Sequence, residues 1–240
     1  MTTVESRSER PHRLGAARDN LISYQRLRFG IGLVGVVLFL TPVVYSLVTN
    51  TWKDSISGYY YTPLRNFFVG SVTLLGAFLV AYKGNSWLDT LLTDLAGLCA
   101  ILLAWDPTYN AGARTWQNML HPICASLAFG LLAIMALLFT QDSSRASTME
   151  QLKLAALAAF FRNKQGFIPR TQMVYVICGD GILVTIIVYV VNELLHGSVP
   201  LIWFEGVMLF FFATCWITAG LRQARADDAT SGANAARSGR

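Results

Sequence analysis

Four acidic residues lie inside or beside long apolar runs of the sequence, where a carboxylate is costly. They are Asp89, Asp94, Asp180 and Glu205. An ionised side chain in the hydrocarbon core of a bilayer needs a partner or a function. Asp94 and Asp180 lie deepest, and Asp180 stands between two glycines. These two acids could line a polar path for a transported solute. Alternatively, a protonated carboxyl could donate a hydrogen bond from one helix to the next.

A second polar cluster combines serine, tyrosine and arginine in the segment SISGYYYTPLR, residues 55–65. Its candidate site residues are Ser55, Ser57, Tyr59, Tyr60 and Arg65. Consecutive tyrosines are typical of a membrane–water interface, which accommodates an apolar ring and a polar tip together. The cluster is therefore either an aromatic belt or the lip of an outward-facing polar pocket, and both interpretations stay open.

Two further residues are expected on the same side of the membrane as this cluster. His121 opens an apolar run, and Glu205 lies one to two turns into the last one. Together with Asp106 they could close the outward-facing pocket, and Glu205 could pair with Arg65. A single His at such a place is otherwise a hydrogen-bonded interfacial residue.

Apolar runs must form the elements that position these residues. The chain has 240 residues and only 14% are charged, against about 25% in a soluble domain, and its mean hydropathy is +0.45. Because a backbone in hydrocarbon must satisfy its own hydrogen bonds, each run of about 20 apolar residues is expected to be a helix. We therefore predict an all-α membrane domain over 29–221, a bundle of six transmembrane helices. The predicted spans are 29–48, 66–82, 88–105, 119–139, 173–191 and 199–221.

Basic residues predict the orientation of the bundle. Of the 19 Lys and Arg residues, only Lys53, Arg65 and Arg114 lie in loops on one side, and the remainder lie in the tails and the other loops. Because cytoplasmic loops carry the excess of Lys and Arg, both ends of the chain are predicted to be cytoplasmic. We expect a multi-pass protein of a bacterial cytoplasmic membrane. The net charge of +5 is then a signal of topology, and the expected partner is the lipid bilayer rather than nucleic acid.

The segments outside the spans are polar. Residues 1–28 and 222–240 are expected to be disordered tails. Residues 147–166 begin with a capping-box pattern and are expected to form an amphipathic helix on the inner leaflet, between the fourth and fifth spans. The alternative is an extension of the fourth span.

The segment 55–65, followed by Phe68-Val-Gly70, resembles a widespread family of uncharacterised bacterial membrane proteins of the domain-of-unknown-function type. The resemblance continues through Lys83-Gly84, Asp94-Leu-Ala-Gly97, Pro107, His121, Tyr175 and Cys178-Gly179. It implies six helices over about 29–220 and gives no activity.

The chain is also distantly similar to metal-dependent membrane hydrolases of the ceramidase and progestin-receptor type, which use a Ser, an Asp and several His. Only Ser55 or Ser57, Asp94 and His121 match those roles, and Tyr61 stands where members of that group carry a His. The similarity implies zinc. The membrane region offers at most one deeply placed imidazole, however, so we expect no metal site and no cofactor.

The favoured function is a small transporter or a lipid- or solute-binding membrane module without enzymatic activity, which could form homo-oligomers. The alternatives are a membrane-embedded metal-dependent hydrolase, with Ser55, Asp94 and His121 as its catalytic candidates, and a structural or assembly subunit of a membrane complex.

Overall fold

The chain folds into helices throughout the part that the structure describes. The computed structural model describes residues 9–84, 86–106, 119–139 and 170–238. Its helices are α1 (Glu9–Thr49), α2 (Arg65–Ala81), α3 (Trp87–Trp105), α4 (Leu120–Leu138), α6 (Arg170–Leu194) and α7 (Leu201–Ser238), with a short 3₁₀ helix η1 (Ser57–Tyr61) between α1 and α2. The described residues contain no strand. The predicted all-helical class is confirmed.

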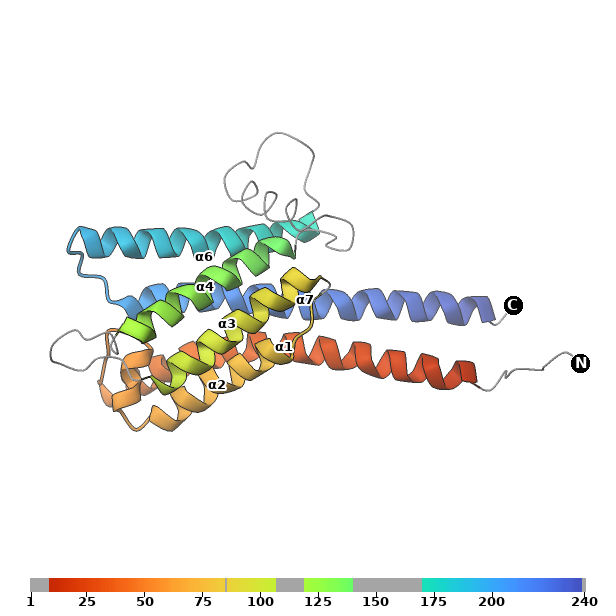
Figure 1. Ribbon diagram of the computed structural model, residues 1–240, viewed down its shortest axis with the longest axis horizontal. Coiled ribbons are helices and arrows are strands. Elements are labelled where there is room, and N and C mark those ends of the chain that lie inside the picture. The colour runs from red at the N-terminus through yellow and green to blue at the C-terminus, as the bar shows by residue number, and fades with distance from the viewer. Residues whose placement is uncertain (1–8, 85, 107–118, 140–169, 239–240) are drawn as a thin grey trace, which may run out of the picture.

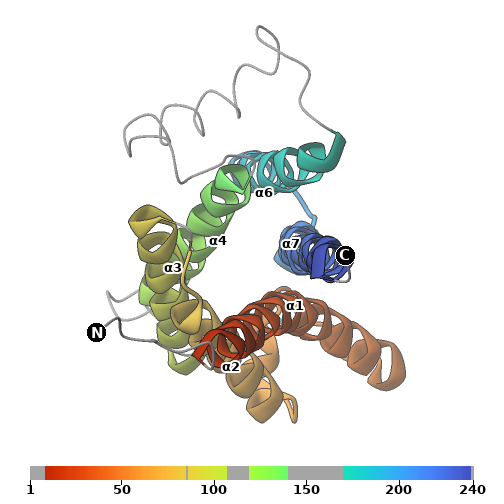
Figure 2. The same ribbon diagram turned by 90° about the vertical axis from the view of Figure 1, so that its right-hand side faces the viewer.

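The six helices form a closed ring. Each helix packs against the next one described along the chain, and α7 returns to pack against α1, as the view along the helices shows (Figure 2). α4 also contacts α7. Many large apolar side chains, such as Leu40, Ile187 and Phe210, are exposed on the described surface. Such exposure suits a lipid environment, because the hydrocarbon core is as apolar as these side chains.

Five of the described helices are long and apolar enough to cross a membrane, and the apolar α2 is shorter, with 17 residues. The bounds of α2, α3 and α4 each differ from the predicted spans by at most one residue. The start of α1 and the end of α7 lie at one end of the ring, which we call the termini end, and η1 lies at the other, the η1 end (Figure 1).

Two helices continue beyond the spans that hydropathy predicts. α1 begins at Glu9 and α7 ends at Ser238, where the sequence predicts disordered tails. Extending an existing helix avoids the cost of nucleation, and the Ala and Arg residues of both segments are good helix formers. The predicted interfacial helix over 147–166 lies outside the described residues.

Glycines allow α2 and α3 to approach closely. A Cβ atom added at Gly76 would lie 2.6 Å from the carbonyl oxygen of Gly97, and one added at Gly97 would lie 2.6 Å from that of Gly76. The two backbones therefore touch at this crossing. Gly76 and Gly97 are therefore the residues that let these two helices approach each other closely.

Candidate functional site

A cavity lies inside the ring, with walls contributed by α1, α2, α3, α4 and α7. On α2 its lining extends from Phe68 to Leu79, a distance of about 16 Å along the helix at 1.5 Å per residue. The cavity has a volume of about 70 Å³. A single water needs about 10–15 Å³, so the cavity is several times larger than the space for one water.

Small side chains on α3 and α4 leave this space open. Ala96 and Ala100 line it from α3, and Ala125 and Ala128 line it from α4. Residues three and four apart share one face of a helix, so these alanines form two facing strips of minimal side-chain volume. The rest of the wall is largely leucine, valine and phenylalanine carbon. An apolar cavity of this kind excludes water unless polar groups reach it.

Polar residues meet the cavity at the η1 end. Ser57, His121 and Glu205 all belong to its lining. The backbone N–H of Ile56 donates a 2.6 Å hydrogen bond to Oε2 of Glu205. The N–H of Ile202 donates to the carbonyl oxygen of Asp54 at 2.7 Å. These two bonds fasten the segment before η1 to the start of α7 and hold the Glu205 carboxylate at the cavity.

His121 is oriented by the end of α3. Its Nδ1 lies 2.8 Å from the carbonyl oxygen of Asp106, and its side chain is 6% exposed. A carbonyl oxygen can only accept, so Nδ1 carries the hydrogen and Nε2 of the neutral ring is an acceptor. His121 is thus both the hydrogen-bonded residue that the sequence predicts and a part of the cavity wall.

The tyrosine-rich segment divides into an inward half and an outward half. Tyr59 is fully buried, and its hydroxyl shares a hydrogen bond with Ser46 of α1. Tyr60 accepts a 2.6 Å hydrogen bond from Arg65, whose guanidinium lies 4.4 Å from the ring centroid. The expected pair between Arg65 and Glu205 is therefore wrong, because η1 turns Arg65 outward to Tyr60.

The two serines of the tyrosine-rich segment form hydrogen bonds within and just before η1. Oγ of Ser55 accepts from the backbone N–H of Gly58 at 3.0 Å and lies 3.0 Å from Oγ of Ser57. Ser57 lines the cavity, whereas Ser55 does not. Ser55 thus stabilises the turn that presents Ser57.

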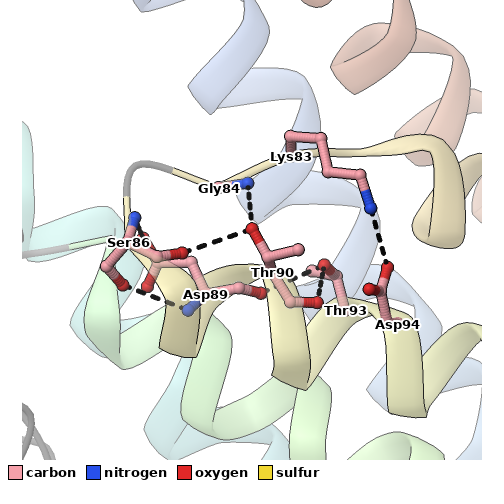
Figure 3. A network of polar contacts seen from close by, with 7 residues as sticks. All are labelled: Lys83, Gly84, Ser86, Asp89, Thr90, Thr93 and Asp94. Carbon is pink, nitrogen blue, oxygen red and sulfur yellow. Dashed lines mark hydrogen bonds and ion pairs between the residues drawn. The ribbon is translucent and has the colours of Figure 1, made fainter.

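The acids of α3, Asp89 and Asp94, do not belong to the lining of the cavity. Figure 3 shows their contacts with neighbouring residues. Asp89 completes a capping box: its N–H donates to Ser86 Oγ at 3.1 Å, and Ser86 N–H donates to Asp89 Oδ2 at 3.1 Å. Asp94 forms a 3.5 Å ion pair with Lys83 of the preceding loop. The sequence placed Asp94 deep in the helix, but Lys83 folds back over this turn to reach it.

Asp180 occupies a tight crossing of α6 with two neighbours. A Cβ at Gly179 would lie 2.6 Å from Leu137 of α4, and one at Gly181 would lie 2.6 Å from Phe211 of α7. Close packing of helices accounts for both glycines. Asp180 also lies outside the lining of the cavity, so the structure does not bring it together with Asp94, which is on a helix not adjacent to α6 in the ring.

The catalytic candidates do not assemble into one centre. Asp94 precedes Asp106 by twelve residues, which is about 18 Å along α3. His121 is hydrogen-bonded to the carbonyl oxygen of Asp106, so it lies far from Asp94. Zinc ligands bind at about 2 Å from the metal, so Asp94 and His121 cannot share an ion. The described residues contain no group of three or more His, Cys, Asp or Glu that could hold a metal.

An aromatic cluster that the sequence did not predict lies towards the termini end of the ring. Tyr82 and Trp216, each 1% exposed, have ring centroids 5.0 Å apart, and Phe139 lies 5.4 Å from Trp216. Arg28 donates a 2.6 Å hydrogen bond to the Tyr82 hydroxyl. The only signal in the sequence was one Arg and several aromatic residues at the ends of different spans.

Comparisons with known proteins give no match: no family model, no curated protein and no solved structure is similar to the chain. The class of protein therefore follows from the helices alone. They are compatible with a multi-pass integral membrane protein whose ring of helices encloses an apolar cavity.

Proposed function

We propose that this protein is a lipid-binding membrane module that holds the hydrocarbon chain of an amphiphile inside its helical ring. The observation that carries the proposal is the cavity, which is apolar along its length and polar at one end. A chain of methylene groups in this cavity would replace empty space with van der Waals contacts. Its polar head would lie at the η1 end, beside Ser57, His121 and Glu205.

The two ends of the cavity differ in their residues, and this difference supports entry of the amphiphile from the η1 end. Tyr82 follows the cavity residue Leu79 just after the end of α2, and Trp216 follows the cavity residue Phe212 by about one turn of α7. Their buried rings therefore lie beyond the lining of the cavity, towards the termini end. Polar residues lie only at the opposite end of the lining. A transport path lined by Asp94 and Asp180 has less support, since neither acid lines the cavity.

The positive-inside distribution of Lys and Arg supports an orientation with the termini end in the cytoplasm and the η1 end outside, in a bacterial cytoplasmic membrane. In that orientation the polar end of the cavity lies near the outer leaflet. An amphiphile could then enter from that leaflet or from the aqueous side.

The test is to fill the cavity and measure which lipids remain bound. Ala100→Leu would place three more carbon atoms in the cavity. Ala77→Leu is the matched control, because Ala77 is exposed on α2 and faces away from the cavity. Each variant would be extracted from membranes in polymer-bounded nanodiscs, and the lipids that stay with the protein after delipidation would be identified by native mass spectrometry.

We expect about one single-chain amphiphile per wild-type protein, the same for Ala77→Leu and almost none for Ala100→Leu. A melting temperature of Ala100→Leu close to that of the wild type would show that the fold is intact. Equal retention by Ala100→Leu and the wild type, or no retained amphiphile in either, would contradict the proposal.

A further inference from the structure

At the η1 end of the cavity lie hydrogen-bond acceptors that have no partner among the described residues. Oε2 of Glu205 accepts from Ile56, but Oε1 has no such partner. Nε2 of His121 likewise has none, because the bond between this ring and a described residue is made by Nδ1. Oδ2 of Asp106, whose carbonyl oxygen bonds to His121, is buried without a partner in the described structure. A buried polar atom is seldom left in this state.

Among the described residues that line this end of the cavity, the donors are already occupied. The N–H of Ile56 is used by Glu205, and Oγ of Ser57 lies 3.0 Å from Oγ of Ser55. These lining residues therefore present more unpaired acceptors than unpaired donors where the polar end of a ligand would lie.

This imbalance defines the chemistry of the head group. Resting on the proposed binding of an amphiphile, we infer that its head group donates hydrogen bonds through hydroxyl or ammonium groups to Glu205 and His121. With Nδ1 of His121 donating to Asp106, Nε2 is an acceptor whenever the ring carries no second proton. In its ionised form Glu205 accepts from a hydroxyl donor and attracts an ammonium group.

The same groups select against acidic amphiphiles. A fatty acid or an alkyl phosphate would place a negative charge beside the Glu205 carboxylate, in a site with little water to screen it. It would also leave the acceptors of Glu205 and His121 unpaired. Selection by an unfavourable interaction of this kind is an effective source of specificity.

A metal ion does not account for the acceptors. The described residues include no group of three or more His, Cys, Asp or Glu that could bind one.

The test compares four amphiphiles with one chain and different heads. Dodecylglycerol ether, dodecylamine, dodecanoate and dodecyl phosphate would each be titrated against the protein in phosphatidylcholine nanodiscs, with bound molecules counted by native mass spectrometry. We expect the glycerol ether and the amine to bind at least about tenfold more tightly than the two acids. Equal or tighter binding of dodecanoate or dodecyl phosphate would overturn the inference while leaving chain binding in the cavity intact.

A substitution at Glu205 tests whether this residue distinguishes the amine from the acidic amphiphiles. Glu205→Gln retains an oxygen for the Ile56 N–H and introduces an amide donor, so the preference for the amine over dodecanoate should fall by about tenfold or more. Arg65→Gln is the control, since Arg65 lies at the same end but faces Tyr60, and its selectivity should equal that of the wild type. An unchanged preference in a folded Glu205→Gln protein would overturn the assignment to Glu205. If Glu205→Gln does not fold, the order of the four wild-type affinities still decides the inference. If no dodecyl compound binds to the wild type, the proposed function itself fails.

Discussion

Replacing Gly76 by alanine should weaken the packing of α2 against α3. The added Cβ would lie 2.6 Å from the carbonyl oxygen of Gly97 and 2.7 Å from Cγ1 of Ile101. The carbonyl belongs to the α3 backbone and cannot rotate away, so the helices would have to separate. Overpacking of this kind costs about 1–3 kcal/mol, and the better helix propensity of alanine returns at most about 1 kcal/mol. We expect a net loss of about 1–2 kcal/mol.

Gly70→Ala is the matched control for this substitution. Gly70 lies on the same helix, and a Cβ there would meet nothing within 4 Å. The free energy of unfolding of the Gly70→Ala protein should therefore exceed that of the wild type by about 0.5–1 kcal/mol, from helix propensity alone. Free energies of unfolding would be measured by reversible denaturation in mixed micelles. A Gly76→Ala protein as stable as the Gly70→Ala protein would refute the idea that the glycines hold this crossing together.

Three further predictions use the same unfolding assay. Ser46→Ala should cost about 1–3 kcal/mol, because it leaves the buried Tyr59 hydroxyl without its Ser46 partner; a loss below about 0.5 kcal/mol would argue against this bond. Ser86→Ala should cost about 1 kcal/mol through loss of the capping box of α3, and unaltered stability would contradict that role. Asp94→Asn should change stability by less than about 1 kcal/mol, because its ion pair with Lys83 is partly exposed; a much larger loss would show that Asp94 supports the fold in another way.

The positions of the helices could be predicted because the thickness of a bilayer fixes the length of a spanning helix. The helices α2, α3 and α4 accordingly lie within one residue of the segments expected from hydropathy. Hydropathy marks a helix only as far as its apolar residues extend. It therefore could not show that α1 begins at Glu9 or that α7 reaches Ser238. Whether a polar segment continues a helix depends on propensity and on contact with a neighbour, which hydropathy does not measure.

The candidate site was predictable as a region but not as a set of contacts. Topology alone assigns His121, Glu205 and Tyr59 to the same end of the bundle. Which groups bond to each other depends on the rotation of each helix about its axis and on the path of η1. Glu205 accordingly accepts from a backbone N–H rather than from Arg65. Ser46, the partner of Tyr59, was missed because a serine within an apolar span gives no signal of its own.

Small residues on α3 have two separate effects, and substitutions can separate them. Gly97 lets the backbone of α2 approach, whereas Ala96 and Ala100 face the cavity. Gly97→Ala would place a Cβ 2.6 Å from the carbonyl oxygen of Gly76 without filling the cavity, so stability should fall while the space for a ligand remains. Ala100→Leu would fill the cavity without touching that crossing, so the ligand should be lost while stability is retained. If both variants lost ligand and stability together, the cavity would be a consequence of loose packing rather than a binding site.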